Sequence, residues 1–304
     1  MSGEHTGKTA LVLAGGGSLG AVQVGMLQAL VESGVQANMV IGASVGAING
    51  AYFAARPHAQ GIEELAELWL SLRSEDVFPI HAFTTIKSLL LGHNHIARAD
   101  GLARLLHNKL PVARIEQTEL PLHILATDLL TGKEALLSSG PLAEALLASS
   151  AIPLIFPHRV IDGQALVDGS IASNTPIASA VELGAERLLV LPTGFGCACP
   201  GVPDRMASLA LHTLNLLSMW QLVRDVEHYQ SRAAIHVVAP LCPQAVSVFD
   251  FSVTAELLSR ARAHTLDWLA QGGLEQEGVP ETLRPHHHEA SGRDRAAGLS
   301  MPTG

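Results

Sequence analysis

The sequence is short of cysteine and of positive charge, and each shortage excludes a class of protein. Its three cysteines, Cys197, Cys199 and Cys242, are an odd number, which argues against a disulfide framework and favours a reducing compartment. Cys197 and Cys199 lack a nearby zinc-type Cys or His pair, so we expect no metal site. The 28 acidic and 19 basic residues give a net charge of −9, without a basic stripe. Such a chain repels polyanions, so nucleic acid is not an expected partner.

A secretory signal and a membrane-spanning helix are also missing from the pattern. The first eight residues include Glu4 and lack the basic segment and apolar run of a signal peptide, so we expect a cytoplasmic protein. Thr9–Val31 and Val35–Ala55 are uncharged and long enough to cross a bilayer, for which about 20 apolar residues suffice. Both contain several glycines and side-chain amides, which is typical of a buried strand followed by a packed helix. Peripheral contact with a membrane or lipid surface stays open.

What the chain does have is a large apolar content in an α/β pattern. Its 304 residues are 48% hydrophobic, which is sufficient for one large core. Thr9–Ala14 and Met39–Ile41 predict buried strands, each followed by a glycine turn and a helix. This alternation predicts an α/β fold with a mainly parallel sheet. Further strands are expected at His123–Thr127 and Arg187–Leu191, and helices at Gly20–Ser33, Ala47–Ala55, Ile62–Leu72, Ala99–Leu110, Pro141–Ser149 and Ile177–Leu183.

The chain is expected to have four regions. We expect a flexible N-terminus at 1–8, a main domain at 9–195, and a C-terminal helical part at 196–272 that packs on the core. That part contains two helical candidates, Asp204–Ser231 and Ala255–Ala270. From Gly273 the chain turns to Gly, Pro, Glu, His and Arg, which cannot repay the entropy of ordering, so 273–304 is expected to be a disordered tail. The stretch Val77–Leu91 is rich in large apolar side chains; three roles are open for it, which are to line a channel for an apolar ligand, to face lipid or to pack in the core.

The first glycine loop allows two readings. Gly15, Gly17 and Gly20 form a GxGxxG pattern between a strand and a helix, as in dinucleotide-binding proteins. Those proteins need a carboxylate at the end of the second strand, where this chain has Gly42, Ala43 and Ser44 instead. In the second reading the loop amides and the helix N-terminus stabilise negative charge on an oxyanion.

A second motif indicates a nucleophilic serine. Gly42, Ser44 and Gly46 form a GxSxG sequence between a predicted strand and a predicted helix, which is where a nucleophile elbow occurs. Small residues on both sides permit the tight turn that exposes the serine hydroxyl. The motif alone occurs often by chance. Its position between a predicted strand and a predicted helix is what makes it evidence for a nucleophile.

These motifs together resemble the patatin-like phospholipases, from about Leu11 to Pro192. The resemblance implies a three-layer sandwich with helices on both faces of the sheet, and a catalytic domain at 9–195. It also implies a Ser-Asp dyad without histidine, an oxyanion hole and no cofactor. The matching residues are Gly15, Gly16, Gly17 and Gly20 for the loop, Gly42, Ser44 and Gly46 for the elbow, and Asp168, Gly169 and Ser170 for the base. Further similar segments are Ala126–Gly132, Ser149–Pro157 and Val167–Pro176.

Two departures from the family pattern matter for specificity and for the base. Leu19 stands where the family often has Arg or Lys, which leaves less positive charge for a lipid phosphate. Ser170 replaces Gly or Ala after Asp168 and Gly169; because the family accepts Ala, a positive φ is not required there. Asp128 lies in a turn and is expected to cap that turn.

The function predicted from these residues is hydrolysis of fatty-acyl esters. Asp168 would accept the proton of Ser44, and the amides of Gly15, Gly16 and Gly17 would hold the developing negative charge. The expected partner is an acyl-ester lipid, and no metal or cofactor is required. Two alternatives are kept: a catalytically weak patatin-like protein that binds lipid or a partner, and the dinucleotide-binding protein. His158 and His212 are the histidines weighed for a triad with Ser44.

Overall fold

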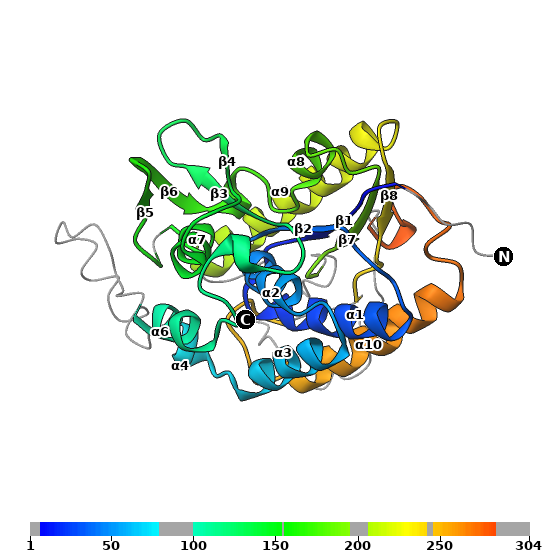
Figure 1. The fold of residues 1–304 in the computed structure, drawn as a ribbon, viewed down its shortest axis with the longest axis horizontal. Helices are drawn as coiled ribbons and strands as arrows, with labels where there is room; N and C mark the ends of the chain where they lie inside the picture. Colours follow the sequence, from blue (N-terminus) through cyan, green and yellow to red (C-terminus); the bar gives the residue numbers. More distant parts are fainter. Residues whose placement is uncertain (1–6, 79–99, 154, 195–205, 242–245, 284–304) are drawn as a thin grey trace, which may run out of the picture.

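An eight-stranded sheet between two layers of helices forms the body of the protein (Figure 1). The computed structural model describes residues 7–78, 100–153, 155–194, 206–241 and 246–283. The strands are β1 Thr9–Leu13, β2 Met39–Ala43, β3 Leu122–Asp128, β4 Glu134–Leu137, β5 Arg159–Ile161, β6 Gln164–Asp168, β7 Arg187–Leu191 and β8 Ala234–Val237. The helices are α1 Gly20–Glu32, α2 Val45–Ala55, α3 Ala59–Ser71, α4 Ser74–Val77, α6 Asp100–Lys109, α7 Leu142–Ser149, α8 Ile177–Glu182, α9 Met206–Tyr229 and α10 Thr254–Ala270. Short 3₁₀ turns join several of them.

The sheet is parallel at its centre and antiparallel at one end. Strands β3, β2, β1, β7 and β8 run parallel in that order. Strands β4 and β6 each pair with β3 in the antiparallel sense, on opposite edges of it, and β5 pairs antiparallel with β6. The predicted mainly parallel α/β sheet is therefore confirmed. Strands β4, β5 and β6 were not predicted, because they are short and only partly buried, so they lack an apolar run.

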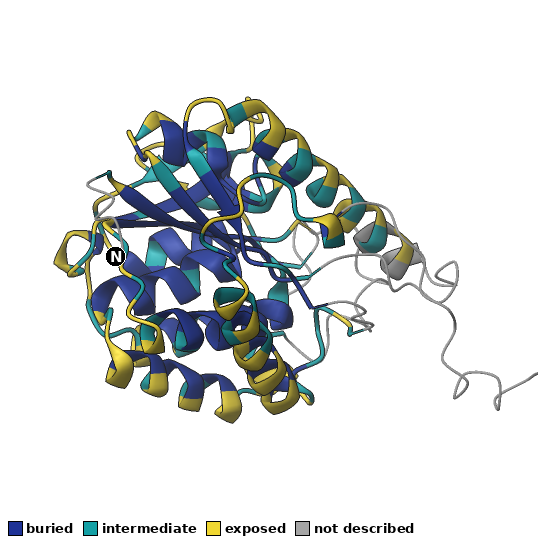
Figure 2. Cartoon of the chain, turned by 90° about the vertical axis from the view of Figure 1, so that its right-hand side faces the viewer, coloured by how far each residue is buried: buried dark blue, intermediate teal, exposed yellow. Residues whose placement is uncertain are grey.

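Alternation along the strands fills two separate cores. Leu11 and Leu13 of β1 face the layer that contains α1, α2, α3, α7 and α10. Ala10 and Val12 of the same strand face α8 and α9. Figure 2 shows the resulting dark-blue sheet between the two helical layers. Because successive side chains point to opposite faces, one short apolar strand serves both layers, which explains why these strands are apolar throughout. The predicted three-layer architecture is confirmed.

The two long uncharged stretches fold as the strand-and-helix pairs that their glycines indicated. Thr9–Val31 contains β1 and nearly all of α1, and Val35–Ala55 contains β2 and α2. Gly34 ends the first pair at φ 72°, with its N–H donating to Val31 O and the next N–H, of Val35, donating to Leu30 O. Within the residues described, no helix combines the length and apolar character needed to cross a membrane.

The most consequential feature of the sheet is the meeting of β2 and β6. Both pair with the same edge of β3, since β4 occupies the other edge: β2 is bonded along Leu122–Leu125 and β6 along Ala126–Asp128. Ala43 lies opposite Leu125, and Asp168 lies opposite the next residue, Ala126. The residue after β2 and the last residue of β6 are thus brought end to end although 124 positions separate them.

The C-terminal part completes the sheet, and part of the expected tail packs on it. Within 196–272, β8 adds a parallel strand beside β7 in addition to the two predicted helices. Residues 273–283 do not continue into solvent as expected: Gly278 N donates to Ile235 O, and Leu283 is 2% exposed against the α8 and α9 side of the core. Three apolar residues, Leu274, Val279 and Leu283, supply the contacts that the overall composition concealed.

Several expectations concern residues outside those described. The N-terminal residues 1–6, most of Val77–Leu91, the three cysteines and the tail beyond residue 283 fall there. Of the apolar stretch, Val77 and Phe78 are described, and both pack against the core.

Candidate active site

Ser44 occupies the sharp turn between β2 and α2. Its backbone has φ 53° and ψ −126°, a conformation that costs a non-glycine residue free energy and that neighbouring contacts must hold in place. The Ser44 N–H donates to Ser149 Oγ at 2.8 Å, and Ser149 Oγ donates to Leu125 O at 2.6 Å. Ser149, at the end of α7, therefore anchors the turn to β3. Strained turns of this kind are typical of nucleophile elbows.

The two glycines of GxSxG are required by close packing of the backbone. A Cβ on Gly42 would lie 2.6 Å from the Gly46 carbonyl group, and a Cβ on Gly46 would collide with Leu13 O. Neither glycine has a positive φ. Glycine is therefore needed here because a side chain would collide with neighbouring backbone atoms, and not because of its conformational freedom. The motif thus lets α2 begin directly above β1.

Asp168 ends β6 beside this turn and forms a direct hydrogen bond with the serine. Ser44 Oγ donates to Asp168 Oδ2 at 2.7 Å, and the Ser170 N–H donates to Asp168 Oδ1 at 2.8 Å. The side chains are buried, with Ser44 6% and Asp168 3% exposed. The sequence placed these two residues together only by resemblance; the meeting of β2 and β6 is the geometric cause.

Burial changes the acidity of this carboxyl group. Desolvation raises the pKa of Asp168 from its ordinary value of 3.8 to about 6, opposed by the Ser170 N–H and by the Ser44 and Ser170 hydroxyls. Near neutral pH the group is therefore mostly ionised yet holds a proton far more readily than a surface aspartate. A carboxylate in this range can exchange a proton with a serine hydroxyl in contact with it.

The glycine loop lies beside Ser44, but its three amides are not equivalent. A Cβ on Gly15 would lie 3.3 Å from the Ser44 Cβ, which places the loop beside the candidate nucleophile. The Gly15 N–H already donates to Asn174 O at 3.0 Å. Among the described residues, the N–H groups of Gly16 and Gly17 donate to no acceptor. Gly17, at φ 59°, also lines the cavity above Ser44. The candidate oxyanion donors therefore narrow to Gly16 and Gly17.

Other residues that the sequence singled out have structural positions. Gly20 packs closely on Val45 and Trp69, and a Cβ on Gly169 would collide with Leu125 O. The Ser170 hydroxyl occupies the space that a Cβ on Gly15 would need, so serine is tolerated after the Asp-Gly pair only because residue 15 has no side chain. Asp128 Oδ1 accepts from the N–H groups of Leu130 and Thr131, which confirms that it caps its turn.

Among the described residues, no histidine is hydrogen-bonded to the candidate dyad of Ser44 and Asp168. Ser44 Oγ donates to Asp168, and neither side chain is hydrogen-bonded to an imidazole. His158 lies just before β5, and His212 lies on α9.

A buried polar network, which the sequence analysis missed, ties the glycine loop to the surrounding helices. Gln23 Nε2 donates to Ala14 O at 2.8 Å and to Leu191 O at 2.9 Å. Asn49 Nδ2 donates to Gly20 O and to Gln23 Oε1, both at 3.0 Å, while Trp69 Nε1 donates to Asn49 Oδ1 at 2.8 Å. The sequence did contain a signal for this network, because Gln23 and Asn49 are amide residues at core positions of two predicted helices.

We expect Gln23→Leu to lower the free energy of unfolding by about 1–3 kcal/mol, because it leaves the buried Ala14 carbonyl without its side-chain donor. Chemical denaturation measures this change. Gln28→Leu on the same helix is the matched control: Gln28 is only half-buried and should change stability by no more than about 0.5 kcal/mol. Equal losses in the two variants would contradict the role assigned to the network.

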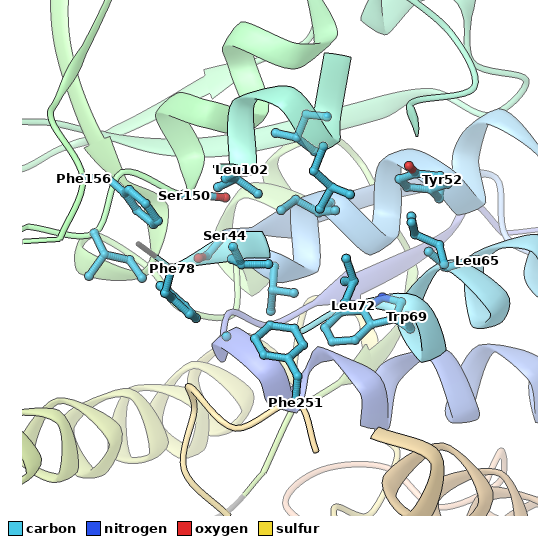
Figure 3. A pocket seen from close by; sticks show the side chains of 18 residues that line it. Ser44, Tyr52, Leu65, Trp69, Leu72, Phe78, Leu102, Ser150, Phe156 and Phe251 are labelled. Atoms are coloured by element: carbon cyan, nitrogen blue, oxygen red, sulfur yellow. The ribbon is translucent and has the colours of Figure 1, made fainter. Parts of the chain in front are cut away.

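An apolar cavity opens beside Ser44 (Figure 3). About 650 Å³ of space lies between its lining residues, and part of that space is open to solvent. Helices α2, α3 and α6 contribute most of its aliphatic wall, and five aromatic side chains complete it. Trp69 stacks on Phe251 with ring centroids 5.8 Å apart, and Phe78 stacks on Phe156 at 6.0 Å. A candidate serine nucleophile at the edge of so apolar a cavity suits a substrate with a hydrocarbon group.

The chain is similar in sequence to several known proteins. The model of the family described as patatin-like phospholipase matches residues 11–181. An uncharacterised NTE family protein of Mycobacterium tuberculosis is 34% identical over 196 residues, which are 63% of this chain and 50% of that protein. The human patatin-like phospholipase domain-containing protein 6 is 30% identical over 196 residues, covering 62% of this chain and 14% of that protein. The chain thus spans at most about half the length of these relatives.

The fold also has a solved counterpart. The human GIVD cytosolic phospholipase A2, solved with a methyl γ-linolenyl fluorophosphonate inhibitor and terbium chloride, aligns with a TM-score of 0.50. The alignment covers 90% of this chain and 60% of that one at 12% sequence identity, a level that bears on the fold alone.

Proposed function

Because the chain belongs to the patatin-like phospholipase family, we propose that it is a lipid acyl hydrolase that cleaves fatty-acyl esters through Ser44 and Asp168. The observation that carries the proposal is the 2.7 Å hydrogen bond from Ser44 Oγ to Asp168 Oδ2 at the rim of an apolar cavity. Both side chains are buried, and the elbow presents the serine to that cavity. Family membership supports lipid hydrolysis in general, and this contact supports the dyad.

The proposed reaction has two halves. Asp168 takes the proton of Ser44 as Ser44 Oγ bonds to the acyl carbonyl carbon, and the negative charge on the carbonyl oxygen is met by the Gly16 and Gly17 amides. The ester bond then breaks, and Asp168 returns the proton to the departing alcohol. Water, deprotonated by Asp168, attacks the acyl group on Ser44, releases the fatty acid and restores the serine. These steps balance without a metal or an organic cofactor.

The head group is less constrained than the acyl group. Leu19 stands where the family often carries a basic residue. It is buried, and its side chain has no charge to offer a lipid phosphate. Contact with a lipid surface remains part of the proposal. Residues 206–221 of α9 carry no Asp, Glu, Lys or Arg, and Leu214, Leu217 and Trp220 expose 47–60% of their surface there. Exposed apolar groups without neighbouring charge suit an apolar interface.

The two alternative functions have weaker support. A dinucleotide-binding protein would need a carboxylate after β2, where Ser44 stands, and the Gly15 amide is already engaged with Asn174. A protein that only binds lipid would have no need of the contact between Ser44 and Asp168. Titration with NADH and a short-chain ester assay separate these alternatives from the hydrolase.

The proposal is tested by incubating the protein with a panel of phospholipids, lysophospholipids and neutral acyl esters and measuring released fatty acid by mass spectrometry. We expect fatty acid from at least one ester class, with dependence on Ser44. Release that is equal in Ser44→Ala, or absent across the whole panel, would contradict it.

A further inference from the structure

One face of α2 forms a straight wall of the cavity that begins at the nucleophile. Val45, Ile48 and Tyr52 all line the cavity, and their spacing of three and four residues places them on one side of the helix. Tyr52 is eight residues beyond Ser44, so it lies about 12 Å further along the axis at 1.5 Å per residue. Figure 3 shows Ser44 and Tyr52 well apart, with Tyr52 at one end beside Leu65.

The cavity ends at Tyr52 because the surroundings change character there. Tyr52 and Leu68 line the apolar cavity and also line a second cavity on their other side. The second cavity is bordered by Arg56, Glu64 and Lys109, whose charged groups do not favour hydrocarbon. The two shared side chains therefore form a partition between an apolar space and a polar one.

We propose that Tyr52 and Leu68 are a stop that limits the acyl group to a medium chain, of about 8–10 carbons. The length follows from the roughly 12 Å of wall, because an extended chain advances about 1.3 Å per carbon with bonds of about 1.5 Å. The inference rests on the proposed function for the identity of the ester and concerns the length of its acyl group. Carbons beyond the stop would have to enter the polar cavity or stay outside.

The Tyr52 hydroxyl is compatible with a role as an apolar barrier. Its Oη is buried and makes no hydrogen bond with the residues that the structure describes. Desolvation raises the pKa of Tyr52 far above its ordinary value, so the ring stays neutral and presents no charge to a hydrocarbon chain. Removing the hydroxyl alone should therefore leave the barrier in place.

The test is the chain-length profile of kcat/KM for p-nitrophenyl esters from C4 to C16, at concentrations below micelle formation. In the wild type we expect kcat/KM to rise by up to about fourfold per methylene as each one is buried, and to stop rising near C8–C10. Tyr52→Ala and Leu68→Ala should move the optimum to longer chains. Ile48→Phe, which places a larger group halfway along the wall, should move it to shorter ones.

Two variants are controls. Tyr52→Phe keeps the ring and should keep the wild-type optimum. Leu70→Ala changes an exposed side chain of α3 that does not line the cavity, and it should leave the profile unchanged. A wild-type profile that rises to C16, or an optimum shared by Tyr52→Ala, Leu68→Ala and Ile48→Phe, would overturn the proposal.

Binding separates this proposal from the proposed function. Calorimetry with fatty alcohols of the same lengths measures the cavity without turnover, and affinity should level off at the same length. An enzyme that hydrolyses C4 ester with a flat chain-length profile would refute the stop and leave the hydrolase standing. A protein that has no esterase activity, but whose affinity for fatty alcohols levels off near C8–C10, would refute the hydrolase and support the stop.

Discussion

Replacing Ser44 by alanine is expected to lower kcat for ester hydrolysis by at least about 10⁴-fold, because the variant has no atom that can form the acyl-enzyme bond. The residual rate would come from the oxyanion donors and the cavity, which the substitution leaves intact. The same variant should lose covalent labelling. A fluorophosphonate probe should add one mass equivalent to the wild-type chain and none to Ser44→Ala, as measured by intact mass.

The Ser44 variant should remain folded, so its inactivity can be assigned to chemistry. Alanine at this position adopts the same positive φ as the serine does. The hydrogen bond to Ser149 Oγ also persists, because its donor is the backbone N–H of residue 44. Ser71→Ala, an exposed serine on α3, is the matched control and should label like the wild type. Undiminished labelling of Ser44→Ala would place the nucleophile elsewhere.

The parts of the fold that sequence could anticipate are those with strong apolar patterns. Strands β1 and β2 are fully buried, so their apolar runs and following glycines stand out. Strand β6 contains the proposed base, Asp168, yet the strand was not predicted, because Gln164 is exposed and only its last three residues are buried. A short strand at the antiparallel end of a sheet gives little periodicity to detect.

The candidate site shows the same division. Gly42, Ser44 and Gly46 could be identified because a local turn needs them. The contact between Ser44 and Asp168 depends on β2 and β6 sharing one edge of β3, which is long-range information that no local pattern contains. Likewise the use of the Gly15 amide by Asn174 O could not be foreseen, because it joins residues from distant parts of the chain.

Asp168→Asn should reduce kcat by at least about 100-fold, because the amide keeps the shape of the side chain and cannot take a proton from Ser44. His158→Gln and His212→Gln should each stay within a few-fold of wild type, since neither imidazole is bonded to the dyad. These three variants test the dyad against a triad. If a histidine variant were as inactive as Ser44→Ala while Asp168→Asn kept its turnover, histidine and not Asp168 would be the base.

The pH dependence gives an independent measurement of the same group. The base must be ionised to act, and burial raises the pKa of Asp168 to about 6, so kcat/KM of the wild type should rise with pH through about 6 and then level off. A profile that levels off near pH 4 would indicate a solvated carboxylate and contradict the buried base.

Stability should change with pH in the opposite direction. Because the folded protein holds this proton more tightly than the unfolded chain, the stabilising contribution of protonated Asp168 is fully present below pH about 4 and is lost as pH rises through about 6. The difference of roughly two pKa units corresponds to about 3 kcal/mol. The amide introduced by Asp168→Asn carries no charge at any of these pH values, so this variant should melt no lower than wild type at pH 8 while losing activity. The wild type therefore gives up stability in the pH range where its base is ionised, as expected when burial of a carboxylate serves catalysis.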